Sequence, residues 1–328
     1  MAEVRTLSVE ADDDGVRLDR WLRRRWPQLG QIQIHKLARS GQLRVDGARV
    51  RADTRLACGA QVRVPPMADA PPKARGAALS PRDIAFAKSL VLFEDDQVLV
   101  LNKPAGLAVQ GGTKTSRHLD GLLGAWGAGM TRPRLVHRLD RDTSGVIVLG
   151  RTPAAAAALA GAFAKRLASK TYWAIVHGVP SPEEGTIDLP LAKIGIGDRE
   201  LVTAVGSGDA RGAAATSEFF TITGSTQGAA WLALSPLTGR NHQLRAHLLA
   251  IGHPILGDPK YNTAASKAFS GALKLQLHAR RLAIPHPAGR GMLDIEAPIS
   301  AEMTAGFARF GFDEGTAPAD PFARHGRG

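Results

Sequence analysis

The segment LVHRLDRDTSG, residues 135–145, is the most distinctive stretch of the chain, and the strongly apolar run Val146–Leu149 follows it directly. A short apolar run bounded by turn residues is typical of a buried strand, so we expect the segment to be a loop that leads into the core. In this loop, Asp140 lies in sequence between Arg138 and Arg141. Such charges often form modest surface ion pairs, so a purely structural role is one interpretation of them.

The order of residues in this loop carries more information than its charges. The pattern His137-Arg138-Leu139-Asp140-x-x-Thr143-Ser144-Gly145 resembles the signature of the RluA family of pseudouridine synthases. The resemblance implies that Asp140 is the catalytic nucleophile, that Arg138 lies beside an extruded nucleotide and that His137 helps to bind the substrate. For Arg138, a guanidinium that only holds the loop in shape is the alternative.

Further motifs of the same family follow in the same order. Lys170-Thr171-Tyr172 resembles the Lys-x-Tyr strand, which implies that Tyr172 lies against the target base; without that context it would be assigned to the core, like Trp173. GRNHQLR, residues 239–245, is similar to the segment whose last Arg pairs with the nucleophile. It implies an ion pair between Arg245 and Asp140, with Leu244 against the base. The resemblance covers about residues 90–298, and its remaining pieces are Leu101–Gly106, Gly252–Asp258 and Leu277–Ala279.

The implied reaction sets the requirements for these residues. Conversion of uridine to pseudouridine breaks the bond between ribose and N1 of uracil and rejoins the base through carbon 5, without redox change or energy input, so we expect no cofactor. Asp140 must be ionised whether it attacks the sugar, attacks the base or assists elimination to a glycal. Burial would raise the pKa of Asp140, and a guanidinium in contact would oppose that rise, which is the role expected of Arg245. The hydroxyl of Tyr172 could take or relay a proton.

Positive charge is concentrated near the N-terminus. The chain has 42 Lys and Arg against 30 Asp and Glu, a net charge of +12, yet residues 15–64 alone hold twelve Lys or Arg and three Asp. A charge this concentrated favours a dedicated polyanion-binding module. A solvated basic face is the alternative.

The periodicity of residues 15–64 predicts two helices and a hairpin. Leu18, Trp21, Leu22 and Trp26 recur at helical spacing, and Pro27 is expected to end that helix. A second helix is expected to end at Gly41, and Asp46-Gly47 suits a hairpin turn before a strand at 61–64. The pattern resembles the RNA-binding domain named after ribosomal protein S-four. It implies phosphate contacts from the cationic side chains Arg20, Arg23, Arg24, Lys36, Arg39 and Arg44.

The whole chain is predicted to be an α+β protein, because its strands outnumber its helices and do not alternate with them regularly. The expected parts are the RNA-binding domain at 15–64, a linker rich in Pro and Ala at 65–88, a synthase domain with a mixed, largely antiparallel sheet at 89–312, and a disordered tail at 313–328. In the synthase domain, strands are expected at 98–101, 146–149, 172–176 and 231–234, with a helix at 153–168.

The expected partner is large-subunit ribosomal RNA, met before or during subunit assembly. Within the family, the likeness is to enzymes of the RluC type; an RluD-type or transfer-RNA-directed specificity and a non-catalytic RNA-binding or ribosome-assembly protein are the alternatives. A non-catalytic protein would be expected to lack the catalytic residues, but Asp140, Tyr172 and Arg245 are all present.

Other classes of protein fit the sequence poorly. The stretch Gly106–Thr115 lacks the Gly-Lys-Ser/Thr adjacency of a phosphate loop. The single cysteine, Cys58, and the five-residue spacing of His242 and His247 do not suit a metal site. The apolar run Pro153–Ala164 is too short to span a membrane. The polar, acidic N-terminus is unlike a secretory signal or a transit peptide, so we expect a cytoplasmic protein. We also expect a monomer without bound metal.

Overall fold

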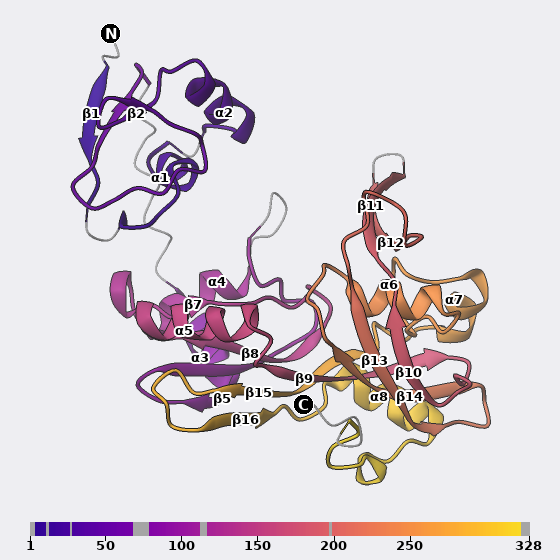
Figure 1. Ribbon diagram of the computed structural model, residues 1–328. Helices are drawn as coiled ribbons and strands as arrows, with labels where there is room; N and C mark the ends of the chain where they lie inside the picture. The colour runs from indigo at the N-terminus through magenta and orange to yellow at the C-terminus, as the bar shows by residue number, and fades with distance from the viewer. Residues whose placement is uncertain are drawn as a thin grey trace. The chain divides into compact units, whose positions relative to one another are not determined.

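The computed structural model describes residues 4–10, 13–26, 28–67, 79–111, 117–196 and 199–322. The chain divides into an N-terminal unit, residues 1–80, and a C-terminal unit, residues 81–328, each of which is described by itself (Figure 1). Several features of the sequence lie outside the described residues: Pro27, Pro71-Pro72, Gly112–Thr115 and the last six residues.

The N-terminal unit packs two helices on a small antiparallel sheet. Its elements are β1 (Arg5–Ser8), α1 (Leu18–Arg25), α2 (Gln31–Arg39), β2 (Arg44–Val45), β3 (Ala48–Arg49) and β4 (Gln61–Val64), with strand order β1-β4-β2-β3. The turn between β2 and β3 has φ 50° at Asp46 and φ 78° at Gly47, the two positive values that a type I′ turn requires. Leu18, Trp21 and Leu22 are fully buried, so the helical spacing of these residues marks the core face. Strand β1 was not predicted.

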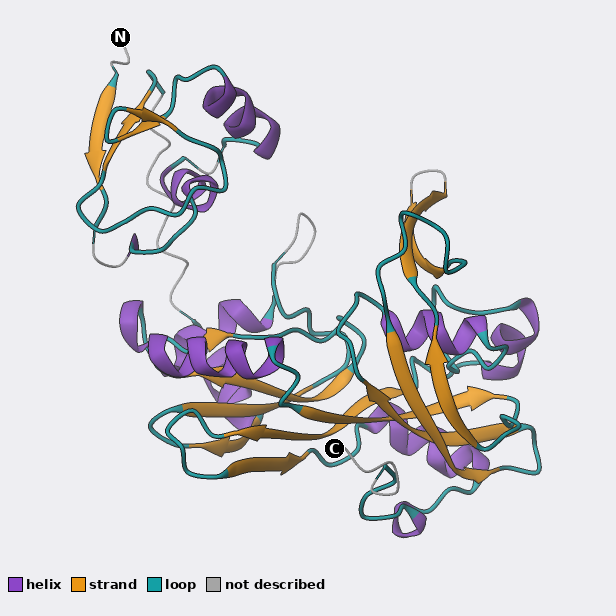
Figure 2. Ribbon diagram, viewed as in Figure 1, coloured by secondary structure: helices purple, strands orange, loops and turns teal. Residues whose placement is uncertain are grey.

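The C-terminal unit is built on one ten-stranded mixed sheet (Figure 2). The order along it is β10-β13-β14-β9-β15-β8-β6-β5, with β16 beside β15 and β7 beside β8. The pair β15–β8 is parallel and the other neighbours are antiparallel. The strands are β5 (Val91–Glu94), β6 (Val98–Lys103), β7 (Arg134–Leu135), β8 (Ser144–Gly150), β9 (Ser169–His177), β10 (Glu184–Asp188), β13 (Thr216–Gly224), β14 (Ala229–Pro236), β15 (Leu277–Pro285) and β16 (Met292–Glu296).

Helices cover both faces of this sheet. The helices are α3 (Pro81–Ser89), α4 (Leu119–Leu122), α5 (Pro153–Ala164), α6 (Gln243–Ala250), α7 (Ala264–Ser270) and α8 (Ala301–Phe310). Because side chains alternate between the faces of a strand, Ala174 and Val176 of β9 pack in the core cluster of α6, while Trp173 and Ile175 pack in that of α8.

A hairpin stands apart from the main sheet. Strands β11 (Leu191–Ile196) and β12 (Arg199–Ala204) form their own two-stranded sheet, which projects from the edge of the unit in Figure 1. Its base packs on α6 through Val202, which shares a core cluster with Ala246 and Tyr261. The sequence analysis did not predict this hairpin.

Two expected boundaries differ from the structure. The proposed linker at 65–88 ends earlier, because residues 81–89 form helix α3 and Ala87 is fully buried. The proposed disordered tail is wrong for residues 313–322: Glu314–Thr316 forms a 3₁₀ helix, and Phe322 is buried in the aromatic cluster of α8 with Phe307. Burial of one large aromatic ring gives this segment the apolar contact that its Gly, Pro and Asp content did not suggest. In the described parts of the chain, no helix is long and apolar enough to cross a membrane.

Candidate active site

Asp140 lies in the loop between β7 and β8, at the start of the buried strand that the sequence predicts. Gly145 allows this strand to begin where it does: its φ is 111°, and a Cβ there would overlap the backbone of Ala279 in β15. Only glycine adopts this conformation readily. The close approach of β8 to β15 therefore fixes the end of the loop.

Lys103 fixes the loop from the other side. Its Nζ is fully buried and donates to the carbonyl oxygens of Pro104 (2.9 Å), Leu107 (2.9 Å) and Arg141 (3.0 Å). Burial lowers the pKa of Lys103 to about 7, against the opposing charges of Asp142 and Asp140. In the sequence, Lys103 is part of the motif Leu101–Gly106 without a predicted role. Only the pairing of β6 with β8 brings it next to the loop that carries Asp140.

Arg245 joins two carboxylates at the start of α6. Its Nη1 donates to Oδ2 of Asp140 at 3.1 Å, while Nε and Nη2 donate to the two oxygens of Asp258 at 2.7 and 2.8 Å. Asp258 also accepts the backbone N–H groups of Lys260 and Tyr261. Burial opposes the charge on Arg245, but its bonds to Asp258 and Asp140 outweigh that effect and raise its pKa. The expected Arg245–Asp140 contact is present in this geometry.

His242 approaches Asp140 from the same side as Arg245. Its Nε2 lies 3.8 Å from Oδ2 of Asp140, and its Nδ1 lies 2.8 Å from the hydroxyl of Tyr261. From the sequence, His242 is one residue of the GRNHQLR motif and a poor metal ligand, and neither Tyr261 nor Asp258 has a predicted role. The motifs that contain His242 and Asp258 were visible, but the contacts join residues far apart in the chain.

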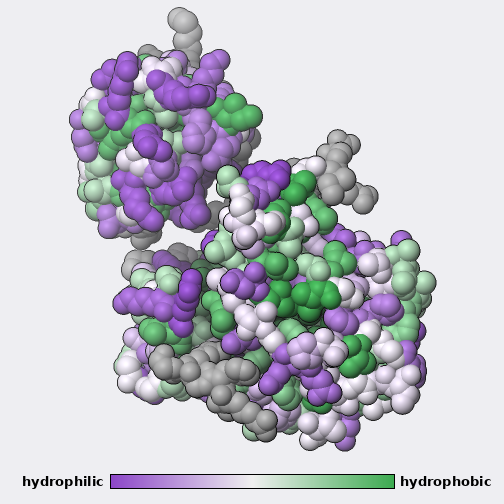
Figure 3. All heavy atoms as spheres, turned by 45° about the vertical axis from the view of Figure 1, so that its right-hand side comes forward, coloured by the Kyte–Doolittle hydropathy of each residue, from purple (hydrophilic) through white to green (hydrophobic). Residues whose placement is uncertain are grey.

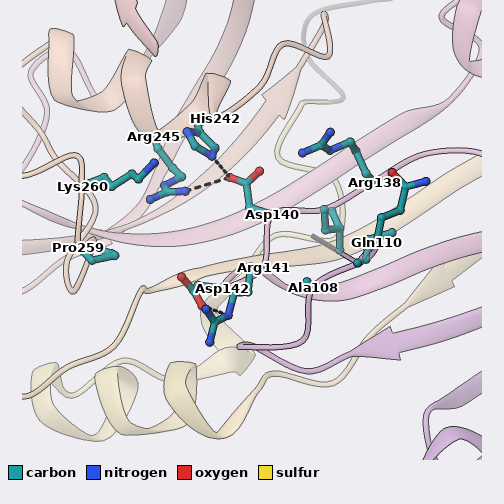
Figure 4. A pocket seen from close by; sticks show the side chains of 13 residues that line it. Ala108, Gln110, Arg138, Asp140, Arg141, Asp142, His242, Arg245, Pro259 and Lys260 are labelled. Atoms are coloured by element: carbon teal, nitrogen blue, oxygen red, sulfur yellow. Dashed lines mark hydrogen bonds and ion pairs between the residues drawn. The ribbon is translucent and has the colours of Figure 1, made fainter. Parts of the chain in front are cut away.

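A pocket of about 490 Å³ opens above these groups (Figure 4). In Figure 4, Arg245 and His242 lie on one side of Asp140, and Arg138 and Gln110 lie on the other. Four of the lining side chains are Arg or Lys and two are Asp, so the pocket suits a ligand that carries phosphate. The lining residues are Ala108–Gly111, Arg138–Asp142, His242, Arg245, Pro259 and Lys260.

Leu244 belongs to the core cluster on the α6 face of the sheet and the partly buried Tyr172 packs against that cluster, but neither is among the residues that line the pocket. Burial, and then the charge of Asp140, raises the pKa of Tyr172, so its hydroxyl keeps its proton at neutral pH. Trp173 points to the opposite face and packs edge-on against Trp231. The structure thus separates two adjacent aromatic residues whose roles the sequence alone left ambiguous.

His137 does not reach the pocket, which corrects the expectation that it binds substrate. Its Nε2 accepts the backbone N–H of Val148 at 3.0 Å, and its ring packs against Phe163 of α5. The ring is half-buried, and its removal from solvent lowers the pKa of His137 to about 3, with a smaller contribution from the charge of Lys170. The ring is therefore a neutral structural group behind the loop, while the next side chain, Arg138, is exposed and lines the pocket.

The six cationic residues expected to contact RNA in the N-terminal unit differ in availability. Arg20, Arg23, Lys36 and Arg39 are exposed on α1 and α2, and in the view of Figure 3 this unit is covered largely by hydrophilic residues. Arg24 pairs with Asp13 at 2.7 Å. Arg44 is half-buried and donates to the carbonyl oxygens of Gly41 and Gly47, so it braces the hairpin.

The fold and the pocket define the class of protein. Residues 97–250 match the family model described as RNA pseudouridylate synthase, and the chain belongs to this family of enzymes. It is similar to the ribosomal large subunit pseudouridine synthase C of Vibrio cholerae serotype O1, with 32% identity over 92% of this chain and 97% of the relative. The protein of the same name from Escherichia coli strain K12 is 31% identical over 90% of this chain and 93% of the relative.

A solved structure shares the fold. Human RNA pseudouridylate synthase domain containing 4 is 26% identical, has a TM-score of 0.58, and aligns with 70% of this chain and 97% of its own. In the described ranges, no group of three or more His, Cys, Asp or Glu side chains is arranged to hold a metal ion.

Proposed function

We propose that this synthase converts uridines of large-subunit ribosomal RNA to pseudouridine and that Asp140 is its nucleophile. The observation that carries the proposal is the partly exposed carboxylate of Asp140 in a cationic pocket, held by a buried guanidinium. Arg245 Nη1 donates to Oδ2 of Asp140 at 3.1 Å, and the ionised carboxylate is the form able to attack.

Other residues of the pocket have roles that follow from their positions. Arg138 is exposed beside Asp140, and its planar group suits the space that a flipped uridine leaves in the RNA stack. For Tyr172 and Leu244, which belong to one core cluster on the α6 face of the sheet, we retain the role of supporting the target base. Because Tyr172 remains protonated at neutral pH, it is a proton donor or relay in this proposal and not a phenolate base.

The choice of RNA rests on relatives that align along almost the whole chain. The alignments with the relatives named ribosomal large subunit pseudouridine synthase C cover 90% or more of this chain, so they include residues of the N-terminal unit. In that unit, the order of two helices and a basic hairpin supports a domain like that of ribosomal protein S-four. Its exposed cationic residues would hold phosphates without reading bases.

Substitution of Asp140 by Asn tests the nucleophile. The amide has nearly the same shape but cannot attack, so we expect pseudouridine formation to fall by at least about a thousandfold while RNA affinity stays within about twofold. The measurement is single-turnover conversion of a large-subunit ribosomal RNA transcript, with the modified positions mapped.

Asp142→Asn is the matched control, because it removes a carboxylate from the same loop. Asp142 also lines the pocket and its charge acts on Lys103, but its ion pair is with Arg141 at 3.8 Å and not with Arg245, so we expect a much smaller loss of activity than for Asp140→Asn. Clear turnover by Asp140→Asn would contradict the nucleophile assignment. Modification of transfer RNA in preference to the ribosomal transcript would contradict the proposed substrate.

A further inference from the structure

His242 has an unusual backbone for a residue beside the reaction centre. It immediately precedes α6 with φ 52° and ψ 22°, a left-handed conformation that non-glycine residues adopt uncommonly. The surrounding bonds hold it there: Ala246 donates its N–H to the carbonyl of His242 at 3.0 Å, and the buried Gln243 accepts from Arg240 N and Thr238 Oγ1. Strained conformations persist where the surroundings enforce them, and they gather at functional sites.

The hydrogen bonds of Tyr261 determine which nitrogen of His242 carries the proton. The hydroxyl oxygen of Tyr261 accepts the backbone N–H of Val202 at 3.2 Å. Among the described residues, Nδ1 of His242, 2.8 Å away, is the acceptor recorded within reach of the Tyr261 hydroxyl proton. If Nδ1 accepts, the hydrogen of a neutral ring is on Nε2.

Burial, more than the surrounding charges, favours the neutral ring of His242. Burial lowers its pKa, and Arg245 and Lys260 lower it further, against the opposing charges of Asp140 and Asp258. A neutral imidazole with its hydrogen on Nε2 offers one donor in the direction of Asp140.

That donor faces the carboxylate oxygen that Arg245 already holds. Arg245 Nη1 lies 3.1 Å and His242 Nε2 lies 3.8 Å from the same atom, Oδ2 of Asp140. Figure 4 shows the second oxygen of Asp140 turned away from both groups. The two oxygens therefore have different surroundings: Oδ2 accepts a hydrogen bond from Arg245 and has Nε2 of His242 3.8 Å away, whereas Oδ1 points away from both groups.

We propose that His242 is a positioning residue for this reaction: Tyr261 holds its ring so that Nε2–H closes on Oδ2 of Asp140 when the nucleotide enters, and Oδ1 is the reacting oxygen. The inference rests on the proposed role of Asp140 as nucleophile. Hydrogen bonds in active sites are often long without substrate and tighten in the complex, which is consistent with the distance of 3.8 Å. Two donors on one oxygen fix the rotation of the carboxylate and keep its attacking lone pair aimed at the substrate.

Two substitutions of His242 separate this role from a structural one. Asn tolerates the left-handed backbone better than most residues, and its short amide can still meet Tyr261 but cannot reach Asp140. Gln places an amide donor near the position of Nε2. For His242→Asn we expect the single-turnover rate at saturating enzyme to fall by about tenfold to a hundredfold, the usual effect of losing a hydrogen bond to a charged group. The Kd for the RNA should stay within about twofold, and His242→Gln should recover most of the lost rate.

A double-mutant cycle tests the contribution of Tyr261. Tyr261→Phe keeps the buried ring that lies 4.9 Å from the Arg245 guanidinium and removes only the hydroxyl. We expect a smaller fall in rate, with no further fall when Tyr261→Phe is added to His242→Asn, because the hydroxyl acts through His242. If His242→Asn does not fold, as shown by the absence of a cooperative thermal unfolding transition, the rates of Tyr261→Phe and His242→Gln are compared with that of the wild type instead.

Three results would overturn the inference: a wild-type rate for His242→Asn, equal losses for Asn and Gln in variants that unfold normally, or additive losses in the cycle. Asp140→Asn is measured in the same assay. An inactive Asp140→Asn beside a fully active His242→Asn would reject the role of His242 alone, whereas an active Asp140→Asn would reject the proposed nucleophile as well.

Discussion

Arg245 is the residue on which the geometry of the pocket most depends, because one guanidinium holds both Asp140 and Asp258. Its side chain is 5% exposed, that of Asp258 is fully buried and that of Asp140 is 18% exposed. Removal of one partner from a buried ion pair costs about 3–5 kcal/mol, so substitution of Arg245 would disturb folding and catalysis together. Asp140, at the edge of this group, can be changed to Asn with less disturbance, which makes it the cleaner test of the chemistry.

The burial of His137 predicts how the stability of the protein depends on pH. The unfolded chain takes up a proton at His137 near pH 6.5, whereas burial keeps the folded ring neutral down to about pH 3. Stability should therefore fall as the pH falls below 6.5, with a slope from this residue that approaches about 1.4 kcal/mol per pH unit. The measurement is the free energy of unfolding between pH 6.5 and 5, for wild type and His137→Gln.

The Gln variant can still accept the N–H of Val148 but does not titrate, so its slope should be shallower. A slope equal to that of the wild type would show that His137 contributes nothing to the loss of stability in acid.

Among the structural elements, β8 decides where Asp140 lies. Its residues are buried along their whole length, and β8 pairs antiparallel with β6 and parallel with β15. The loop that carries Asp140 enters this strand, and Arg141 at its centre is held through its carbonyl by Lys103 of β6. A buried strand between two neighbours leaves the loop little freedom to move.

Gly145 gives a test of this arrangement. A Cβ at this position would overlap the backbone of Ala279, and its φ of 111° is unfavourable for alanine. We expect Gly145→Ala to lower the free energy of unfolding by about 3 kcal/mol or more and to reduce activity, because the start of β8 must shift. Thermal or denaturant unfolding measures the first effect.

Gly161→Ala is the matched control on α5. Nothing lies within 4 Å of a Cβ added there, and alanine is favoured over glycine in a helix by about 0.5–1 kcal/mol. This variant should be slightly more stable than wild type and fully active. Equal stability of the two alanine variants would contradict the role given to Gly145.

The concentrated positive charge and the proposed catalytic residues lie in different units of the molecule. The concentrated positive charge belongs to the N-terminal unit, while Asp140 and its partners all belong to the C-terminal unit. In the second unit, cationic side chains act as individually placed groups, such as Arg245 on Asp140 and Arg138 at the pocket. We therefore expect RNA affinity and the rate of the chemical step to respond to different substitutions.

Replacement of Arg20, Arg23, Lys36 and Arg39 by Gln in the full chain tests that separation. Each lost phosphate contact should reduce the slope of log Kd against log salt by about 0.7, so binding should weaken and depend less on salt. The single-turnover rate at saturating enzyme should stay near that of the wild type. An unchanged salt slope would contradict the role of these residues in holding RNA.

A control for the loss of a single surface charge uses Arg211, which is exposed but bound by Asp209 at 2.6 Å. Arg211→Gln removes a cation whose charge is already paired, so it should alter the salt slope less than any one of the four substitutions. If Arg211→Gln changed the salt slope as much as the four substitutions do, the slope would depend on the total charge of the protein and not on these residues of the N-terminal unit.

The sequence by itself determined the features that depend on local pattern. Short apolar runs bounded by turn residues predicted β6 and β8, and helical spacing predicted α1, because burial selects apolar residues in the pattern of the element. The Asp46-Gly47 turn followed from the need for two positive φ values. The resemblance of short motifs to a known family predicted the contact between Asp140 and Arg245, although these residues are 105 positions apart in the sequence.

Only the tertiary structure decided which side chains meet. No sequence pattern predicted that Lys103 holds the carbonyl of Arg141, that Asp258 shares Arg245, or that Tyr261 contacts His242, because each contact joins different segments of the chain. It also assigned His137 to the substrate when its ring faces Val148, and it treated residues 81–88 and 313–322 as unstructured. A side chain's direction depends on which strand or helix packs beside it, and that partner is chosen by burial across the whole unit rather than by neighbours in sequence.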